Sequence, residues 1–220
     1  MEAETRAPEV PRVKLGSKKL EVSRLGLGCF QLTGLFKAPL SDEEGIAVIK
    51  QAFDRGITFF DTADRYGPHK TEILIGKALK QLPREKVRVA SKFGIVKLEC
   101  GVLKTNGKPE CVGACCEASL DRLGVEYIDL YYQYRVGLTV RIEDNVSTEL
   151  CIICFLISSY RFSKDNLEHT ILHIRGANLA AKHGCNPAQP ALAWLLHHRK
   201  DVVPIPEPVI LFTLSRINSP

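Results

Sequence analysis

Four residues of types that move protons stand at equivalent points of the chain. Asp61, Lys92 and Tyr134 each end a short apolar segment, and Tyr66 follows Asp61 by five residues in a turn rich in glycine and proline. A lysine ammonium beside a tyrosine hydroxyl favours the phenolate and so eases proton donation by the tyrosine. A carboxylate would hold the ammonium in place. These residue types therefore suit acid catalysis at a polarised oxygen.

Each residue alone also has an ordinary structural explanation. A single tyrosine in a turn usually lies on the surface, and a single aspartate after a strand usually caps the next helix. Their shared position favours a site, because the carboxyl ends of parallel strands form the rim where (β/α) barrels gather catalytic groups.

The elements that would position these residues alternate along the first 135 residues. Ser41 and Glu44 form a capping box at the start of the first helix, and Gly56 ends it. Strand and helix patterns then follow in turn, which predicts a parallel sheet with right-handed crossovers and mostly short connections. The predicted segments are the hairpin strands 13–15 and 20–22, strands 25–29, 57–60, 87–91 and 127–133, and helices from 41, 71–82 and 109–123.

The alternation weakens after Arg135. Residues 139–149 are polar and mixed, and residues 150–157 are all apolar or cysteine. Helices are predicted again over 166–183 and 187–198, and a last strand over 202–205. The residues from 206 onward show no clear periodicity.

Composition excludes several classes of protein. The chain has 220 residues, 45% hydrophobic and 25% charged, which is ordinary for one globular domain. No apolar run reaches the ~18–20 residues of a membrane span, and the polar start shows no signal peptide, so we expect a cytoplasmic protein without a membrane partner. The net charge of +5 comes from interleaved acids and bases, so nucleic acid is not expected as a partner.

The cysteines point to neither a metal site nor a redox centre. Of the eight cysteines, Cys151 and Cys154 form the one C-x-x-C pair, inside the apolar run. A structural zinc site needs a second pair of ligands, and none stands at a suitable spacing. We predict no metal and interpret the cysteines as small hydrophobic residues.

Several long motifs resemble the aldo-keto reductase superfamily. Within it, the similarity is strongest to plant enzymes of the perakine reductase and auxin-induced-protein type. The motifs are FFDTADRYG (59–67), ASKFG (90–94), LDRLGVEYIDL (120–130), LGLGCF (25–30) and AAKHGCNPAQPALAW (180–194).

This resemblance implies a (β/α)8 TIM barrel that binds NADPH and reduces an aldehyde or ketone. Tyr66 would be the proton donor, Lys92 would lower its pKa, and Asp61 would pair with Lys92. Hydride would come from the nicotinamide. Gly28, Cys29 and Asp61 would contact the cofactor.

The chain departs from the family pattern at three places. Tyr134 stands where the family has a histidine that ends the fourth strand. Residues 150–159 stand where the family has its fifth to seventh strands, so about five of eight strands can be assigned. Glu207 stands in the loop after the last strand, where the family holds a phosphate. An acid at that position opposes an anion.

Two interpretations follow. In the first, the chain is an NADP-dependent aldo-keto reductase with impaired activity. In the alternative, it is an inactive truncated homologue that binds a full-length relative through an open sheet edge, or an unstable product. The expected organisation is a disordered leader (1–11), an incomplete barrel (12–205, family-like over 12–149 and 160–205, with a junction at 150–159) and a divergent tail (206–220).

Overall fold

The computed structural model describes residues 10–16, 20–34, 38–99, 102–135, 167–198 and 200–208. Residues 1–9 of the expected leader (1–11), the junction over 150–159 with Cys151 and Cys154, and residues 209–220 of the expected tail (206–220) lie outside these residues. In chain order the elements are β1 (Arg12–Leu15), β2 (Leu20–Ser23), β3 (Leu27–Gly28), η1 (Phe30–Thr33), α1 (Asp42–Asp54), β4 (Phe59–Asp61), α2 (Lys70–Leu79), η2 (Arg84–Lys86), β5 (Arg88–Phe93), β6 (Ile95–Glu99), β7 (Val102–Thr105), α3 (Pro109–Leu123), β8 (Leu130–Gln133), α5 (Leu167–Lys182) and α6 (Ala188–His198).

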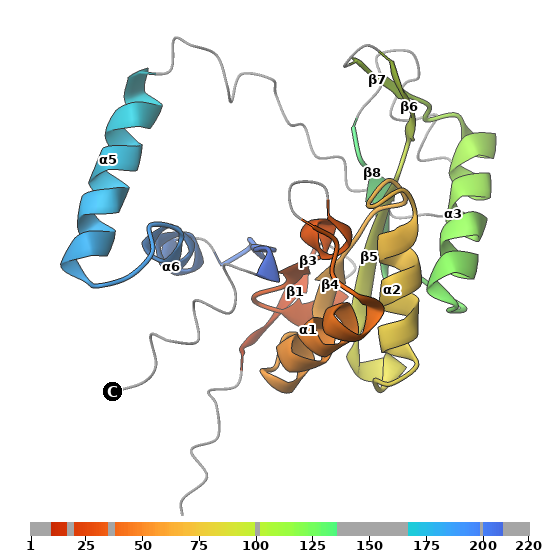
Figure 1. Cartoon of the computed structure of the whole chain (residues 1–220), viewed down its shortest axis with the longest axis horizontal. Coiled ribbons are helices and arrows are strands. Elements are labelled where there is room, and N and C mark those ends of the chain that lie inside the picture. Colours follow the sequence, from red (N-terminus) through yellow and green to blue (C-terminus); the bar gives the residue numbers. More distant parts are fainter. Residues whose placement is uncertain are drawn as a thin grey trace, which may run out of the picture.

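A parallel sheet forms the centre of the described part, in the order β3-β4-β5-β8. Helices α1, α2 and α3 cover one of its faces (Figure 1). Phe60 and Val89 point to this face and pack with Ile49 of α1 and Ile75 of α2. Burial of these apolar side chains on both sides of the helix–sheet interface is what joins the two layers.

The opposite face of the sheet carries the site. Side chains alternate between the two faces of a strand, so Phe59 and Asp61 share the face that is turned away from the helices. Ala90 and Lys92 share it on β5, and Tyr132 shares it on β8. The β1–β2 hairpin packs against the amino-terminal part of this face through Val22. Polar groups therefore gather at the carboxyl end.

A segment without assigned strand extends the sheet beyond β3. Gly26 and Gly28 donate their N–H groups to the carbonyls of Pro204 and Pro206, both at 3.0 Å. The equal offset of the two bonds means that residues 202–206 run parallel to β3. Because proline has no N–H, this segment returns no bonds from those two positions. The expected last strand over 202–205 thus lies where a barrel strand would, with an incomplete ladder.

Most other predicted elements are confirmed. Ser41 and Glu44 make the reciprocal capping box, Gly56 follows α1 with φ of +86°, and Gly124 ends α3 with φ of +61°. The second helix stops at Leu79 rather than at residue 82, and β8 starts at Leu130 rather than at residue 127.

The expectation of short connections is wrong at one place. Between β5 and α3 the chain forms an antiparallel hairpin, β6–β7, where none was predicted. Its two strands are short and carry lysines among the apolar residues, so they lack the buried apolar run that marked the other strands.

The two C-terminal helices lie to one side of the sheet (Figure 1). Helix α6 is tied to the sheet through Arg24, whose guanidinium donates to the Leu196 carbonyl. Within the described ranges, no helix combines the length and apolar character that a membrane crossing needs.

Candidate active site

The carboxyl ends of β4 and β5 and the loop after β4 bring three of the predicted site residues into direct contact. Lys92 Nζ donates to Asp61 Oδ1 at 2.5 Å, to the Thr62 carbonyl at 2.8 Å and to the Tyr66 hydroxyl at 2.9 Å. An ammonium has three N–H donors, and all three are used here. Lys92 is therefore fixed in position, with one of its protons aimed at the tyrosine oxygen.

The loop after β4 turns Tyr66 inward. Gly67 has φ of +57°, and a Cβ at this position would lie 2.0 Å from Thr33 Oγ1. Only glycine suits both the left-handed backbone and the close approach of η1. The Tyr66 side chain is consequently held over the sheet and is only 8% exposed.

The Tyr66 hydroxyl is held in its protonated form. Burial raises its pKa, and the negative charge of Asp61 raises it further. The expected lowering of this pKa by Lys92 is therefore outweighed in this structure. A protonated phenol is the form that an acid catalyst needs, and the hydrogen bond from Lys92 would favour the phenolate once the proton leaves.

Tyr132 belongs to the cluster, and the sequence did not indicate it. Its hydroxyl donates to Asp61 Oδ2, while Lys92 takes the other oxygen of the same carboxylate. Burial raises the pKa of Asp61, and the bonds from Lys92 and Tyr132 oppose that shift. Tyr132 pairs directly with Lys92 in the β5–β8 register. Because alternate residues of a strand share a face, the prediction of Tyr134 at the site could have pointed to Tyr132 as well.

Tyr134, at the position of the family histidine, lies beside Tyr66. The two ring centroids are 6.0 Å apart with the rings nearly perpendicular, and Phe30 packs edge-on against Tyr66 from another side at 4.8 Å. Tyr134 is half-buried. Two aromatic rings thus pack against the Tyr66 ring and limit the access of water to it.

Gly28 and Cys29, the predicted cofactor contacts, lie under the last segment. A Cβ on Gly28 would meet the Ile205 carbonyl oxygen at 2.7 Å, so glycine is needed for the close approach of that segment. Cys29 is fully buried, and burial raises the pKa of its thiol well above the ordinary value. Its side chain is a protonated, enclosed thiol rather than a surface for a ligand.

Glu207 closes this side of the rim. Its Oε2 accepts a hydrogen bond from the backbone N–H of Gln31 at 3.2 Å. Its Oε1 lies 3.5 Å from the position that a Cβ on Gly28 would occupy. Its pKa is raised to about 7, chiefly by burial and also by the charge of Asp61, while the bond from the Gln31 N–H and the charge of Lys92 oppose the rise. A second carboxyl group therefore faces the Asp61–Lys92 pair.

The residues present fit the proton donation of the expected reduction better than they fit the binding of the cofactor phosphates. Barrels often bind phosphate at the loops after their last strands. Here the loop after residues 202–206 presents a carboxylate, which already occupies the N–H of Gln31. The proton-donating residues fit the expected chemistry, and an ionised Glu207 does not fit the phosphates of NADPH.

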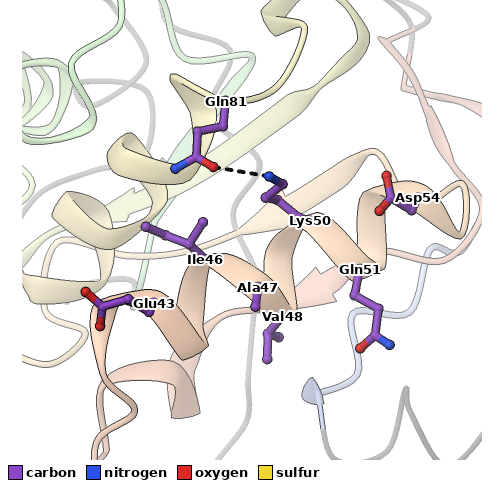
Figure 2. A pocket seen from close by; sticks show the side chains of 8 residues that line it. All are labelled: Glu43, Ile46, Ala47, Val48, Lys50, Gln51, Asp54 and Gln81. Carbon is purple, nitrogen blue, oxygen red and sulfur yellow. Dashed lines mark hydrogen bonds between the residues drawn. The ribbon is translucent and has the colours of Figure 1, made fainter.

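The surface hollow on α1 is separate from this cluster. It is lined by α1 residues and Gln81, to which Lys50 donates at 3.2 Å (Figure 2). It contains none of the residues discussed above. Nor do the described residues include a group of three or more histidine, cysteine or acidic side chains arranged to hold a metal.

Comparison with known proteins agrees with the fold. The profile of the Aldo/keto reductase family matches residues 24–149, which is more than half of the chain. Probable aldo-keto reductase 1 of Glycine max is 37% identical over 278 residues, covering 90% of this chain and 80% of that protein. This alignment is longer than the chain itself, so part of the relative faces a gap in this sequence.

Solved structures show the same architecture. A thermostable aldo-keto reductase in complex with the inhibitor epalrestat matches with a TM-score of 0.67 at 22% identity, over 93% of this chain and 94% of that one. The holo form of an aldo-keto reductase from Bacillus halodurans matches with a TM-score of 0.55 at 27% identity, over 63% of this chain and 44% of that one, so less than half of its length is spanned. The expected incomplete (β/α)8 barrel is confirmed. The chain belongs to the aldo/keto reductase family.

Proposed function

We propose that this site reduces the carbonyl group of an aldehyde or ketone to an alcohol, as an NADP-dependent oxidoreductase whose turnover is impaired. The observation that carries the proposal is the chain of contacts from Asp61 through Lys92 to the Tyr66 hydroxyl. Family members generally use NAD(P)H. Glu207 and the altered position 134 are the reasons to expect impairment.

In this proposal Tyr66 supplies the proton. The carbonyl oxygen accepts a hydrogen bond from the Tyr66 hydroxyl, and it gains negative charge as the carbonyl carbon takes up a hydride, which bound NADPH would supply. The proton then passes from the phenol to that oxygen. Lys92 stabilises the resulting phenolate through its existing 2.9 Å bond, and Asp61 keeps Lys92 in place.

Tyr134 has a narrower role than a histidine would have. Its hydroxyl can donate a hydrogen bond, but it cannot carry a positive charge near neutral pH. We infer that it limits the space above Tyr66, and that the preferred carbonyl compounds are those that pass between Phe30 and Tyr134.

The first test is turnover of a panel of aldehydes and ketones with NADPH, comparing the wild type with Tyr66→Phe. Loss of the proton donor should reduce turnover by about 10²–10⁴-fold. Tyr127→Phe is a matched control, because Tyr127 is 47% exposed and lies before β8. Activity that survives Tyr66→Phe would show that the proposed proton donor is wrong.

A second candidate function is a catalytically inactive partner of a full-length relative. The contact between Glu207 and Gln31 favours it, because an anionic rim opposes cofactor binding. It predicts no turnover, no rise of the melting temperature with NADPH, and co-elution with a full-length family member in size-exclusion chromatography. A melting temperature that rises with NADPH supports the reductase instead, because only ligand bound to the folded state stabilises it.

The finer placement within the family is also a proposal. The resemblance to the plant perakine reductase group is supported by a relative from Glycine max. We likewise propose a cytoplasmic location, on the sequence grounds given above. Substrate profiles measured beside those of several plant reductases test the first of these.

A further inference from the structure

Glu207 is the acidic group that the proposed reaction does not use, although it lies at the catalytic rim. Its carboxylate is half-buried, bound to the Gln31 N–H and near the position of Gly28. The segment that carries it is fixed to β3 by the two backbone bonds from Gly26 and Gly28. The carboxylate is therefore held over the carboxyl end of β3 by the backbone.

The ionisable groups near Glu207 are either paired with each other or held neutral. Asp61 of β4 and Lys92 of β5 are paired with each other at 2.5 Å, so their charges largely cancel. The Cys29 thiol and the Tyr66 phenol, which also lie within electrostatic range of Glu207, are both held neutral by burial. Glu207 is therefore a carboxyl group beside this neutral set without an ion-pair partner among the described residues. Asp64, in the loop after β4, also has its pKa raised by burial, to about 6, and Glu207→Gln leaves Asp64 in place.

We propose that Glu207 controls the access of phosphate-bearing ligands to this rim, which accepts them when Glu207 is protonated and repels them when it is ionised. This inference rests on the proposed function, because it concerns the cofactor side of the same site. It assigns to Glu207 a regulatory role that the proton-donating cluster does not need.

The expected change in anion affinity with pH follows from the fraction of molecules in which Glu207 is protonated. Burial raises the pKa of Glu207 to about 7, so about 90% of molecules carry a neutral Glu207 at pH 6 and about 10% at pH 8. Apparent Kd varies inversely with the fraction that can bind, so the affinity for an anion should fall about tenfold over this range.

The test measures the Kd of inorganic pyrophosphate and of NADP⁺ at pH 6 and pH 8 by isothermal titration calorimetry. The proteins are the wild type, Glu207→Gln and Glu85→Gln. Glutamine keeps the shape and an oxygen for the Gln31 N–H, and it removes the charge. Glu85 is exposed and precedes β5, at the opposite end of the sheet, so it is a matched control. Glu207→Ser is a second charge-free variant in case Glu207→Gln folds poorly.

The comparison between variants removes the titration of the probes themselves. In the wild type and Glu85→Gln, Kd should rise from pH 6 to pH 8 by about tenfold more than in Glu207→Gln. At pH 8 the Glu207→Gln variant should bind about tenfold more tightly than the wild type. Equal pH dependence in all three proteins, or binding of neither probe by any of them, would overturn the inference.

Failure of this inference differs from failure of the proposed function. If the variants titrate alike while turnover remains sensitive to Tyr66→Phe, the role of Glu207 is wrong and the reductase proposal stands. If Glu207→Gln binds the anions more tightly but no Tyr66-dependent turnover is found, the role of Glu207 stands and the reductase proposal fails.

Discussion

Two buried ion pairs lie on opposite faces of β5. Ser91 contacts one of them, and the next residue, Lys92, is part of the other. Ser91 points to the helix layer and donates to Glu72 at 2.6 Å, and Glu72 also accepts from Arg122 Nε at 2.6 Å. Lys92 points to the other face and binds Asp61 and Tyr66. The first pair joins α2, α3 and β5, whereas the second lies at the rim.

The difference lies in what the third group of each cluster can do. Ser91 has no route to a ligand, because it is fully buried under the helices. Tyr66 is at the rim, and its proton can leave without breaking the ion pair beside it. A carboxylate, a cation and a hydroxyl therefore meet on both faces. One set is structural, and the other is the set to which we assign proton donation in the proposed function.

The largest expected effect comes from the structural pair. Arg122→Met leaves Glu72 fully buried without its cation, which should lower the free energy of unfolding by about 3–5 kcal/mol. Urea denaturation measures it. Lys77→Met, which breaks an exposed pair with Asp42, should cost less than about 1 kcal/mol. Similar losses in both variants would mean that burial of the pair does not matter.

Lys92→Met should affect chemistry more than stability. We expect turnover to fall by about 10²–10⁴-fold, because the phenolate of Tyr66 loses its cation. The loss of stability should be smaller than for Arg122→Met, since Asp61 keeps the Tyr132 hydroxyl and its pKa is already raised by burial, which lets it take up a proton. Steady-state kinetics and urea denaturation of the same samples test both statements.

Tyr132→Phe should have an intermediate effect. It removes one hydrogen bond to a buried carboxylate, which should cost about 1.5–3 kcal/mol of stability. Turnover should fall about tenfold or less with KM unchanged, because Lys92 still holds Asp61 by its other oxygen. A change in KM without a change in turnover would place Tyr132 at the substrate rather than behind it.

The smallest expected effect is the pH dependence of stability from Glu207. Its pKa is raised from an ordinary 4.5 to about 7, so the folded chain binds this proton more tightly than the unfolded chain. The stability it contributes is full below about pH 4.5 and is lost as the pH rises through about 7. Relative to Glu207→Gln, the wild type should lose about 1 kcal/mol between pH 5 and pH 8.

The comparison with Glu207→Gln is needed because the contribution of a second acid to stability also falls as the pH rises. Burial raises the pKa of Asp64 to about 6, so it also destabilises the folded chain as the pH rises. Thermal unfolding of the two proteins at a series of pH values isolates the part due to Glu207. Parallel curves would contradict the expectation.

The sequence was sufficient to predict that Asp61, Tyr66 and Lys92 lie together, because these residues follow strands. Asp61 and Lys92 end or nearly end segments whose apolar character is plain, so parallel pairing had to bring them to one edge. Tyr132 was missed because its direction depends on which residue of β8 pairs with Lys92. That register is set by the packing of the whole sheet rather than by local sequence.

Other features could not be read from local patterns. The contact between Glu207 and Gln31 joins residues far apart in the chain, so only the folded backbone reveals it. The β6–β7 hairpin was missed because its lysines hide the alternation of its strands. The predicted helix continued to residue 82, but the chain leaves the α-helical bonding pattern early: Gln81 and Leu82 donate to the carbonyls three residues before them, just ahead of Pro83.

The prolines of the last segment have a consequence for how this molecule opens. Pro204 and Pro206 accept from β3, but they have no N–H to return, so this seam has fewer hydrogen bonds than the ladders within the β3-β4-β5-β8 sheet. Local opening should begin where the fewest bonds must break. The amides of Gly26 and Gly28 should therefore exchange with deuterium faster than those of β5, and we expect this seam to open before the rest of the sheet unfolds.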